Sequence, residues 1–383
     1  MPTRPTWAEV SLHALRHNFR LLREHVAPVG VCAVIKADAY GHGIVGCARA
    51  LEAEGAAWFG VTCTEEGVQL REAGIKARIL LMSGFWRGEE QAVVEHDLTA
   101  AIWSREHIDL LRAAAARGLA REAVHLKVDT GMSRLGASVA ELPQLCEALK
   151  SGSPAGGNIF LEGVFSHFAS AEVLGAPDVR EQLTRFEEAM GIIARSGLTP
   201  SCQHLANSAA MVTTRDSWKS MVRPGISLYG YYLPMSSMMT GVPDTSLQLP
   251  VRPVLSWKTR IIQVRDVPAR TRVGYNGAFI TQVPSKLATL PVGYADGLSR
   301  QLSSRGRVIL RGEYAPIVGN VSMDLTTIDV TGVPSAELGD EVILIGESAD
   351  KKITAWDHAN LAGTIPYETL CGITKRVPRL HKS

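Results

Sequence analysis

The first 240 residues alternate between a short apolar run and a longer amphipathic stretch, and this alternation repeats eight times. Short apolar runs are typical of buried strands, whereas apolar residues three and four positions apart are typical of helices. Ser11–Val26 shows the helical pattern, with Ser11 as a candidate N-cap residue. The predicted strands are Val31–Ala37, Trp58–Cys63, Arg78–Ser83, Leu98–Trp103, Ala123–Thr130, Leu161–Phe168, Ser201–Ser208 and Met221–Gly230. Eight strand–helix repeats predict a (β/α)8 barrel, with an open doubly wound sheet as the alternative.

The pattern changes after about residue 245. Three prolines mark the break: Pro243, Pro250 and Pro253. The runs that follow have a strand-like alternation: Leu255–Val267, Lys286–Val292, Arg307–Arg311, Ile317–Val330 and Glu341–Ile345. Within Val318–Asp329 the period of two places Val321, Met323 and Leu325 on one face. With one late helix near Thr354–Leu361, this part is predicted to be a mostly β domain.

A chain of 383 residues is long enough for two domains, which we place at residues 1–243 for the barrel and 244–383 for the mostly β domain. The formal net charge of +2 gives no reason to expect nucleic acid or a membrane as a partner. No signal-like segment is found at the start, and no apolar stretch approaches the roughly 20 residues that a bilayer requires. The six cysteines lack C-x-x-C spacing, so no metal site is expected, and free thiols suit the cytoplasm.

Active sites of such barrels lie at the C-terminal ends of the strands. The polar residues that close the predicted strands are Lys36, Lys127, Arg134, His167, Asn207, Ser208 and Arg223. A lysine at the end of an apolar strand is desolvated, which depresses the pKa of its amine and favours Schiff-base chemistry. The alternative for Lys36 is a structural lysine whose amine reaches solvent from the strand end. Tyr40 follows where the chain turns through Gly41 and Gly43.

The segment 33–43, which reads AVIKADAYGHG, closely resembles the lysine signature of alanine racemases that depend on pyridoxal phosphate (PLP). Nine further segments resemble the same family in the same order: His125–Gly136, Ser166–Ala169, His204–Ala210, Arg223–Ile226, Val273–Gly277, Pro291–Gly297, Ser322–Asp324, Tyr367–Cys371 and Arg376–Arg379. The resemblance implies a PLP enzyme of fold type III that interconverts L-alanine and D-alanine by two-base proton transfer at Cα. Such an enzyme supplies D-alanine for peptidoglycan.

The resemblance also implies how PLP is held. Lys36 matches the lysine that binds PLP through a Schiff base, and Arg134 matches the arginine that binds the phenolic oxygen and the substrate carboxylate. Arg223 matches the arginine that faces the pyridine nitrogen, where a permanent cation donates a hydrogen bond but no proton; taken alone, it could be a surface ion-pair residue. The other residues that the resemblance assigns to the cofactor are Tyr40, His167, Asn207, Ser208, Gly225, Ile226 and Tyr367. Asn207 and Ser208 could also cap a helix, which is compatible with phosphate binding at the same N-terminus.

Tyr275 resembles the second catalytic base, which acts on the face of Cα opposite Lys36. A free phenol has a pKa near 10, so its use as a base requires nearby positive charge, such as that of Arg223 with His167. In the family this tyrosine and the methionine at Met323 reach the PLP of a partner subunit. The resemblance therefore implies a head-to-tail homodimer with shared active sites, in which Met323 contacts substrate.

The remaining implied residues support the site: Lys127, Tyr294 and Asp324. Family members often carry the lysine at Lys127 as a carbamate formed with CO2, which would turn a repelling cation into an anion that orients Arg134. Asp129 could neutralise the two cations without any modification. Three departures from the family pattern fall outside the catalytic positions: Ser133, Asn276 and Lys375.

Three other functions are compatible with parts of this pattern. A broad-spectrum or serine racemase shares the fold, although Lys127 and Tyr367 favour alanine. A decarboxylase on the same barrel would need a Gly-rich phosphate loop and an acidic partner for the pyridine nitrogen, and the sequence has Arg223 instead. A non-catalytic PLP carrier would lack the β domain and its tyrosine.

Overall fold

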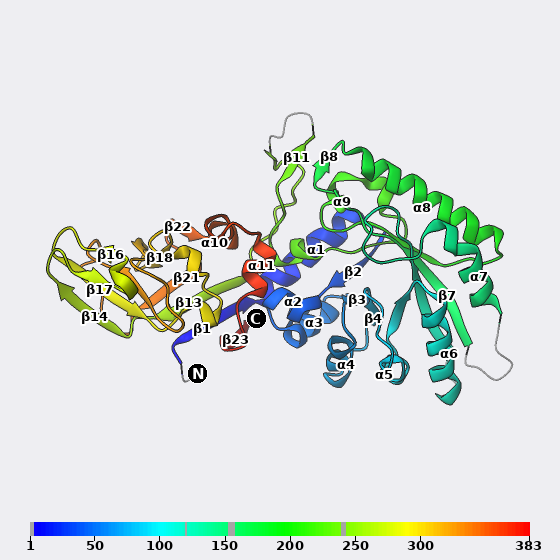
Figure 1. Cartoon of the computed structure of the whole chain (residues 1–383), viewed down its shortest axis with the longest axis horizontal. Coiled ribbons are helices and arrows are strands. Elements are labelled where there is room, and N and C mark those ends of the chain that lie inside the picture. The colour runs from blue at the N-terminus through cyan, green and yellow to red at the C-terminus, as the bar shows by residue number, and fades with distance from the viewer. Residues whose placement is uncertain (1–3, 119–120, 152–157, 239–242) are drawn as a thin grey trace. The chain divides into compact units, whose positions relative to one another are not determined.

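The computed structural model describes residues 4–118, 121–151, 158–238 and 243–383 (Figure 1). The chain divides into two compact units. The first, here called the barrel unit, comprises Leu15–Ala39 and Ile44–Arg252. The second, here called the β unit, comprises Met1–Ala14, Tyr40–Gly43 and Pro253–Ser383.

Eight parallel strands form the barrel unit in the order β10-β2-β3-β4-β5-β6-β7-β9. Their bounds are β2 Gly30–Val34, β3 Trp58–Val61, β4 Arg78–Leu81, β5 Thr99–Ile102, β6 Arg121–Lys127, β7 Asn158–Phe165, β9 Cys202–His204 and β10 Met221–Val222. Each lies within or next to one of the eight predicted strands. The chain around β10 also bonds to the chain around β9, since Ser220 N donates to Gln203 O at 3.0 Å and Arg223 N donates to Ala206 O at 2.9 Å. The predicted (β/α)8 barrel is therefore confirmed over the doubly wound alternative.

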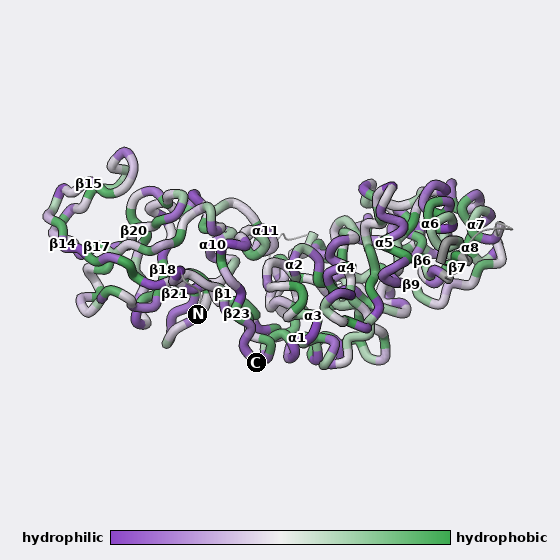
Figure 2. The backbone as a smooth tube through the Cα atoms, turned by 90° about the horizontal axis from the view of Figure 1, so that it is seen from below, coloured by the Kyte–Doolittle hydropathy of each residue, from purple (hydrophilic) through white to green (hydrophobic). Residues whose placement is uncertain are grey.

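Helices lie around these strands in Figure 1 and alternate with them along the chain. The main ones are α1 Leu12–Val26, α3 Ile44–Ala53, α4 Thr64–Glu72, α5 Glu90–Glu95, α6 Arg105–Gly118, α7 Leu142–Lys150 and α8 Pro177–Arg195. The predicted N-cap is present, because Ser11 Oγ accepts from Ala14 N at 3.1 Å. Hydrophilic residues interrupt the apolar ones along these helices (Figure 2), and none of the described helices has the length and apolarity to cross a membrane.

The β unit is built on a seven-stranded sheet with the path β19-β18-β21-β13-β1-β23, to which β22 adds beside β21. Its strands are β1 Thr6–Ser11, β13 Leu255–Arg260, β18 Arg307–Leu310, β19 Glu313–Pro316, β21 Glu341–Ser348, β22 Lys351–Ile353 and β23 Arg379–Lys382. The first strand pairs antiparallel with β13 and parallel with β23. This pairing groups residues 4–14 with the β unit, whereas the division at residue 243 placed them with the barrel. The domain boundary at residue 243 stays a prediction.

Two smaller ladders complete the β unit. One contains β14 Gln263–Val267, β17 Ser285–Leu290 and β20 Thr326–Asp329, and the other pairs β15 Arg272–Val273 with β16 Phe279–Ile280. The predicted late helix is confirmed as α10 Ala355–Ala362, with the Thr354 hydroxyl accepting from Asp357 N. The unit also contains α11 Pro366–Cys371, which was not predicted.

The prediction of one long strand over Ile317–Val330 was wrong, since only Thr326–Asp329 is a strand there. Val321 is buried, but Met323 and Leu325 are 54% and 44% exposed, so the three side chains do not share a buried face. The reason is a tight turn, in which Ser322 N donates to Leu325 O at 3.0 Å and the Ser322 hydroxyl donates to the same oxygen. Alternation of apolar and polar residues here reflects a turn and not a pleat.

Candidate active site

Predicted site residues lie at, or follow closely on, the C-terminal ends of five barrel strands. Because parallel strands end on the same side of a barrel, their side chains meet at one mouth. The residues are Lys36 after β2, Lys127 at the end of β6, His167 after β7, Ser208 after β9 and Arg223 after β10. The charges of Lys36, Arg134 and Arg223 all act on both Lys127 and His167, which shows that the structure brings these groups together.

Lys36 begins an unusual left-handed turn. The strand β2 ends at Val34, earlier than predicted, and the next residues form the short element α2 Lys36–Gly41. The φ angles of Ala37, Asp38, Ala39 and Tyr40 are +53° to +54°, a region that costs L-residues about 1–2 kcal/mol each. Such strain persists only where the surroundings hold it, and it is concentrated at functional sites.

Hydrogen bonds to Asp38 hold this left-handed turn. Its Oδ1 accepts from Ile44 N at 2.7 Å, and its own N donates to Glu66 Oε1 at 3.2 Å. The carboxylate of Glu66 also accepts from Thr62 N at 3.2 Å, beyond the end of β3. The turn that presents Lys36 is therefore tied to the neighbouring strand of the barrel and to the start of α3.

Lys127 is a buried cation at the end of β6. Its exposed fraction is 6%, and its Nζ donates to Met82 O at 3.1 Å and lies 5.3 Å from the centre of the Phe165 ring. Burial, followed by the charges of Arg223, Arg134 and Lys36, lowers the pKa of Lys127 to about 8. The amine is consequently still mostly protonated near physiological pH, but roughly a tenth to a fifth of it is neutral, far more than for an ordinary lysine.

Asp129 raises the pKa of Lys127, as the sequence suggested, but it is the weakest of the five influences. Its Oδ1 instead accepts from Gly131 N at 2.9 Å and from Ser133 N at 3.0 Å. The carboxylate thereby shapes the loop that follows β6 and carries Arg134, whose side chain is exposed.

This Arg134 loop closes at Gly136, where φ is +131°. A Cβ at Gly136 would lie 2.6 Å from Asp129 N and 2.8 Å from the carbonyl carbon of Val128, so no side chain fits. We expect Gly136→Ala to lower the free energy of unfolding by roughly 3 kcal/mol, through backbone strain together with overpacking. Thermal and urea unfolding would measure this loss.

A matched control separates the two causes. Gly74 has a φ of +85° but open space around its Cβ position, so Gly74→Ala retains the strain without the clash. We expect that variant to lose only about 1 kcal/mol. Equal losses in the two variants would contradict a rigid Arg134 loop.

Arg223 is 3% exposed, which rules out the surface ion pair. One terminal nitrogen, Nη2, donates to Ser166 O at 2.7 Å and to Leu205 O at 3.0 Å, while Nη1 donates to His204 Nδ1 at 2.6 Å. His167 Nδ1 lies 3.4 Å from Nη2, so the imidazole is directly beside the guanidinium. Burial lowers the pKa of Arg223 to about 10, and burial together with this arginine lowers the pKa of His167 to about 3. At neutral pH the site thus holds a charged guanidinium beside a neutral imidazole.

Ser208 lies at a backbone turn where two strands end. Its Oγ accepts from Gly225 N at 2.9 Å and from the Ser227 hydroxyl at 3.0 Å, next to the short 3-10 helix Ile226–Tyr229. Asn207 Oδ1 accepts from Ala209 N at 3.0 Å and Ala210 N at 2.9 Å. Asn207 therefore caps the turn leading into α9 Ala210–Thr213, while the Ser208 hydroxyl and the N–H groups beside it are of the kind that binds phosphate.

The β unit holds the other predicted residues. Tyr40 and Tyr367 lie together, with ring centres 5.8 Å apart. Tyr294 is linked to the turn at Met323, because Tyr294 N donates to Ser322 O at 3.0 Å. Both of these side chains are exposed, by 43% and 54%, and Asp324 accepts from Arg376 at 2.7 Å on the same turn.

Tyr275 is the most exposed of the predicted site residues in the β unit, with 72% of its surface accessible in the single chain. It begins the 3-10 turn Tyr275–Gly277, and its carbonyl accepts from Asn320 Nδ2 at 3.2 Å. Asn276 follows with a φ of +60°, a conformation that asparagine tolerates better than most residues. This explains why asparagine is tolerated at this departure from the family pattern. Ser133 adopts a similar φ of +56°, and Lys375 is exposed.

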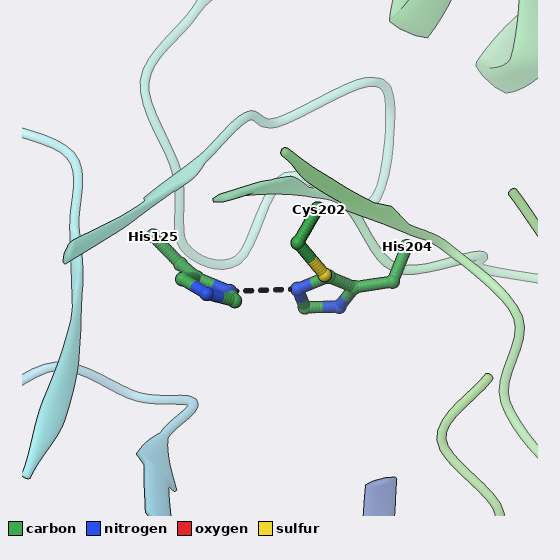
Figure 3. Close-up of side chains that lie close together, drawn as sticks. All are labelled: His125, Cys202 and His204. Carbon is green, nitrogen blue, oxygen red and sulfur yellow. Dashed lines mark hydrogen bonds between the residues drawn. The ribbon is translucent and has the colours of Figure 1, made fainter. Parts of the chain in front are cut away.

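Sequence reasoning assigned no role to the polar residues inside the barrel. His125, Cys202 and His204 lie on β6 and β9, and Figure 3 shows the two imidazoles side by side, with the cysteine next to them. His125 Nδ1 and His204 Nε2 are 2.8 Å apart, and both rings are fully buried. The available signal was a histidine within each of two predicted barrel strands.

The barrel mouth fits an anionic, planar cofactor such as PLP. Lys36, Lys127, Arg134 and Arg223 bring four positive charges together, and two of them are buried. A buried group of like charges is stabilised by anionic ligands. Hydroxyl and N–H donors at Ser208 suit a phosphate, and the lysine amine suits a covalent bond to an aldehyde.

Comparison with known proteins bears on the whole chain. The family model described as alanine racemase, N-terminal domain, matches residues 10–233, and the one for the C-terminal domain matches residues 254–381. An alanine racemase of Caldanaerobacter subterraneus is 41% identical over 379 residues, covering 99% of this chain and 95% of that protein. One from Syntrophobacter fumaroxidans is 42% identical over 371 residues, covering 96% of this chain and 95% of that protein.

Solved structures agree with this. The crystal structure of alanine racemase from Bacillus anthracis with bound L-Ala-P has a TM-score of 0.91 and 32% identity, covering 100% of this chain and 96% of that one. The enzyme from Bartonella henselae, solved with covalently bound pyridoxal phosphate, has a TM-score of 0.84 and 30% identity, covering 100% of both chains.

These findings confirm the family, the PLP-dependent enzyme class and the alanine racemase activity predicted from the ten sequence segments. They also exclude the decarboxylase and the non-catalytic carrier, because both domain models match along nearly the full length. The chain belongs to the alanine racemase family.

Proposed function

We propose that this chain binds PLP at the mouth of its barrel and interconverts L-alanine and D-alanine there by proton transfer at Cα. The observation that carries the proposal is the convergence of Lys36, Lys127 and Arg223 at the ends of parallel strands with Arg134 from the loop after β6. The solved relatives with bound L-Ala-P and with covalently bound pyridoxal phosphate support both the substrate class and the cofactor.

Different residues at the barrel mouth would bind different parts of PLP and of the substrate. Lys36 would hold PLP covalently, and Ser208 with the backbone around Gly225 and Ile226 would hold its phosphate, with Tyr40, Tyr367 and Asn207 supporting that end. When bound, PLP delocalises the electron pair left on Cα after its proton departs. Arg223 would donate to the pyridine nitrogen without protonating it, which limits that delocalisation and with it side reactions such as transamination. Arg134 would hold the substrate carboxylate.

Two bases on opposite faces of Cα would move the proton. Lys36 would exchange it with D-alanine and Tyr275 with L-alanine, so that neither base has to cross the substrate. The enantiomers have equal free energies in water, and the protein can therefore change only the barrier. Met323 would contact the substrate, and Tyr294 and Asp324 would support the site.

A partner subunit would supply Tyr275. The tyrosine, together with Tyr294 and Met323, is exposed in the single chain, although each is large and partly apolar. Exposed apolar side chains of this kind mark interaction surfaces. A head-to-tail homodimer would cover them and complete each site.

Lys127 would carry a carbamate. Its neutral amine, made available by a pKa of about 8, would form a bond to the carbon of CO2 and release one proton. The resulting anion would offset the positive charge that Arg134 and Arg223 concentrate at the mouth.

We place the enzyme in the cytoplasm, where it would supply D-alanine for peptidoglycan. All six cysteines are free, and Cys32, Cys47 and Cys146 are buried. Free thiols persist in a reducing compartment, which supports this location.

Racemisation by the purified protein tests the proposal. With PLP added, L-alanine should be converted to D-alanine until the two are equal, and the reverse reaction should reach the same ratio. L-serine under the same conditions tests the broad-spectrum alternative, and we expect its kcat/KM to be at least about tenfold lower. A protein that binds PLP but leaves L-alanine unchanged would overturn the proposal.

A further inference from the structure

A continuous line of polar side chains runs through the barrel from Arg223 to Arg78. Arg223 Nη1 is 2.6 Å from His204 Nδ1, His204 Nε2 is 2.8 Å from His125 Nδ1, and His125 Nε2 is 3.3 Å from Glu162 Oε2. Glu162 in turn forms an ion pair with Arg78, whose Nη2 donates at 2.5 Å. Arg223 follows the C-terminal end of β10 and Arg78 begins β4, so the line joins the two ends of the barrel.

Arg223 at one end of the line and Glu162 at the other require the same direction of donation in every hydrogen bond between them. A guanidinium can only donate, so His204 Nδ1 accepts and carries no proton. An ionised carboxylate can only accept, so His125 Nε2 carries a proton and donates it. In a neutral imidazole one nitrogen donates and the other accepts. Each ring is therefore protonated on Nε2, and His204 Nε2 donates to His125 Nδ1 without conflict.

The charge states required for this direction are supported by the surroundings. Burial lowers the pKa of His204 well below its usual value and also lowers that of His125, so both rings are neutral at neutral pH. Burial opposes ionisation of Glu162, but hydrogen bonds from His125 and Arg78 prevail and lower its pKa to about 2. Glu162 is thus an acceptor over the physiological range.

The backbone of β6 and β7 favours the contact between Glu162 and His125. The pairing of β6 with β7 shifts between Val124 and His125, because Val124 pairs with Leu161 and His125 pairs with Gly163. Glu162 is the extra residue of this bulge, and bulges re-aim side chains. A Cβ at Gly163 would lie 2.6 Å from the His125 ring, so only glycine leaves room for the imidazole.

A metal ion is the competing explanation for His125, Cys202 and His204, whose ligand atoms lie within 4.8 Å of one another (Figure 3). The facing nitrogens of the two rings are already joined by a hydrogen bond, and the outer nitrogen of His204 contacts the Arg223 guanidinium. A cation placed beside a buried arginine is electrostatically unfavourable. Burial also raises the pKa of the Cys202 thiol to about 11, which disfavours the thiolate that metals bind.

We propose that Glu162 and His125 are positioning residues for catalysis, which stabilise, from the end of the line opposite Arg223, the His204 tautomer that accepts from Arg223, and so hold the Arg223 guanidinium in place for the pyridine nitrogen. This inference rests on the proposed function and extends it to side chains that touch neither cofactor nor substrate. If Glu162 no longer fixed the direction, His204 could place a proton on Nδ1, and this N–H would point at the Nη1 donor of Arg223.

The first test reads the tautomers in the unmodified protein. Nitrogen NMR of histidine labelled with 15N distinguishes protonated from bare ring nitrogens, and signals of the two residues are assigned by their loss in His125→Asn and His204→Asn. At neutral pH, with and without PLP, we expect both rings to be protonated on Nε2 alone. A proton on Nδ1 of either ring, or on both nitrogens, would overturn the proposal.

The second test removes the fixed acceptor. In Glu162→Gln the amide can either accept or donate, so we expect a mixture of tautomers at His204 and a kcat lowered by about tenfold with KM little changed. Glu147→Gln is the control, because Glu147 forms an exposed ion pair with Lys150, and its kinetics should be unchanged. An unaltered kcat in folded Glu162→Gln would count against the proposal.

The outcomes separate this inference from the proposed function. If the wild-type protein does not racemise alanine, the function fails, whereas the tautomer measurement still stands or falls by itself. If racemisation proceeds but zinc co-purifies in equal amount and is lost in His125→Asn, the metal site replaces the line of hydrogen bonds. Should Glu162→Gln not fold, the NMR result on the wild-type protein decides.

Discussion

Lys36→Ala is expected to abolish covalent binding of PLP and to lower racemisation by at least about 10³-fold in both directions. The amine of Lys36 has two tasks, to hold the cofactor and to exchange the proton of D-alanine, and general acid–base catalysis alone contributes about 10²–10⁴-fold. Borohydride reduction of the loaded protein, followed by digestion and mass spectrometry, should find the cofactor attached at Lys36. In the variant no peptide should carry it.

Lys150→Ala is the matched control for this change, because Lys150 is exposed and pairs with Glu147 three residues away. The control should bind PLP and turn over as the wild type does. Attachment of the cofactor to another lysine in the wild-type protein, or more than a tenth of the wild-type activity in Lys36→Ala, would contradict the assignment.

Tyr275→Phe is expected to lower kcat by about 10³-fold for both enantiomers, because the loss of one base blocks the single route between them. The equilibrium constant of one forbids a variant that is slow in one direction only. The exchange of the Cα hydrogen with solvent distinguishes the contribution of Lys36 from that of Tyr275. In deuterium oxide, D-alanine should still exchange through Lys36 without inversion, whereas exchange of L-alanine should be lost.

Tyr314→Phe is a control for the loss of a phenol from the β unit, since the Tyr314 hydroxyl donates to Lys352 O on the same sheet. It should leave both exchange reactions unchanged. Equal loss of exchange for both enantiomers in Tyr275→Phe would show that the tyrosine does not act on one face alone.

The barrel could be predicted because several of its strands are buried on both sides and consist of continuous apolar runs. In β4 the residues Ile79, Leu80 and Leu81 are fully buried. Such an apolar run can be recognised in the sequence without knowing which strands lie beside it. The residues at the barrel mouth could be predicted for the same reason, since a polar residue that ends a buried barrel strand lies at the C-terminal mouth of the barrel.

The strained turn after β2 could not be predicted. Nothing in Ala37–Tyr40 favours a left-handed conformation, and propensity predicts the opposite for four L-residues in succession. The turn is stabilised by a local bond from Ile44 N to Asp38 and by a bond from Asp38 N to Glu66. The second bond joins parts of the chain that only the fold brings together.

The same limitation applies to β1 and to the interior of the barrel. The strand Thr6–Ser11 pairs with β13, about 250 residues along the chain, so its place in the β unit depends on a long-range contact. The role of Glu162 depends on a bulge of one residue, and spacing along one strand does not reveal where the partner strand shifts.

Mixed dimers test most directly the claim that one subunit's Lys36 and its partner's Tyr275 form a single site. Lys36→Ala and Tyr275→Phe subunits, each nearly inactive alone, would be exchanged under mild denaturation and the mixed species isolated by two different tags. In a mixed dimer one of the two sites combines an intact lysine with an intact tyrosine, so about half of the wild-type activity per dimer should return. Isolated mixed dimers that bind PLP and remain as inactive as either parent would contradict the shared site.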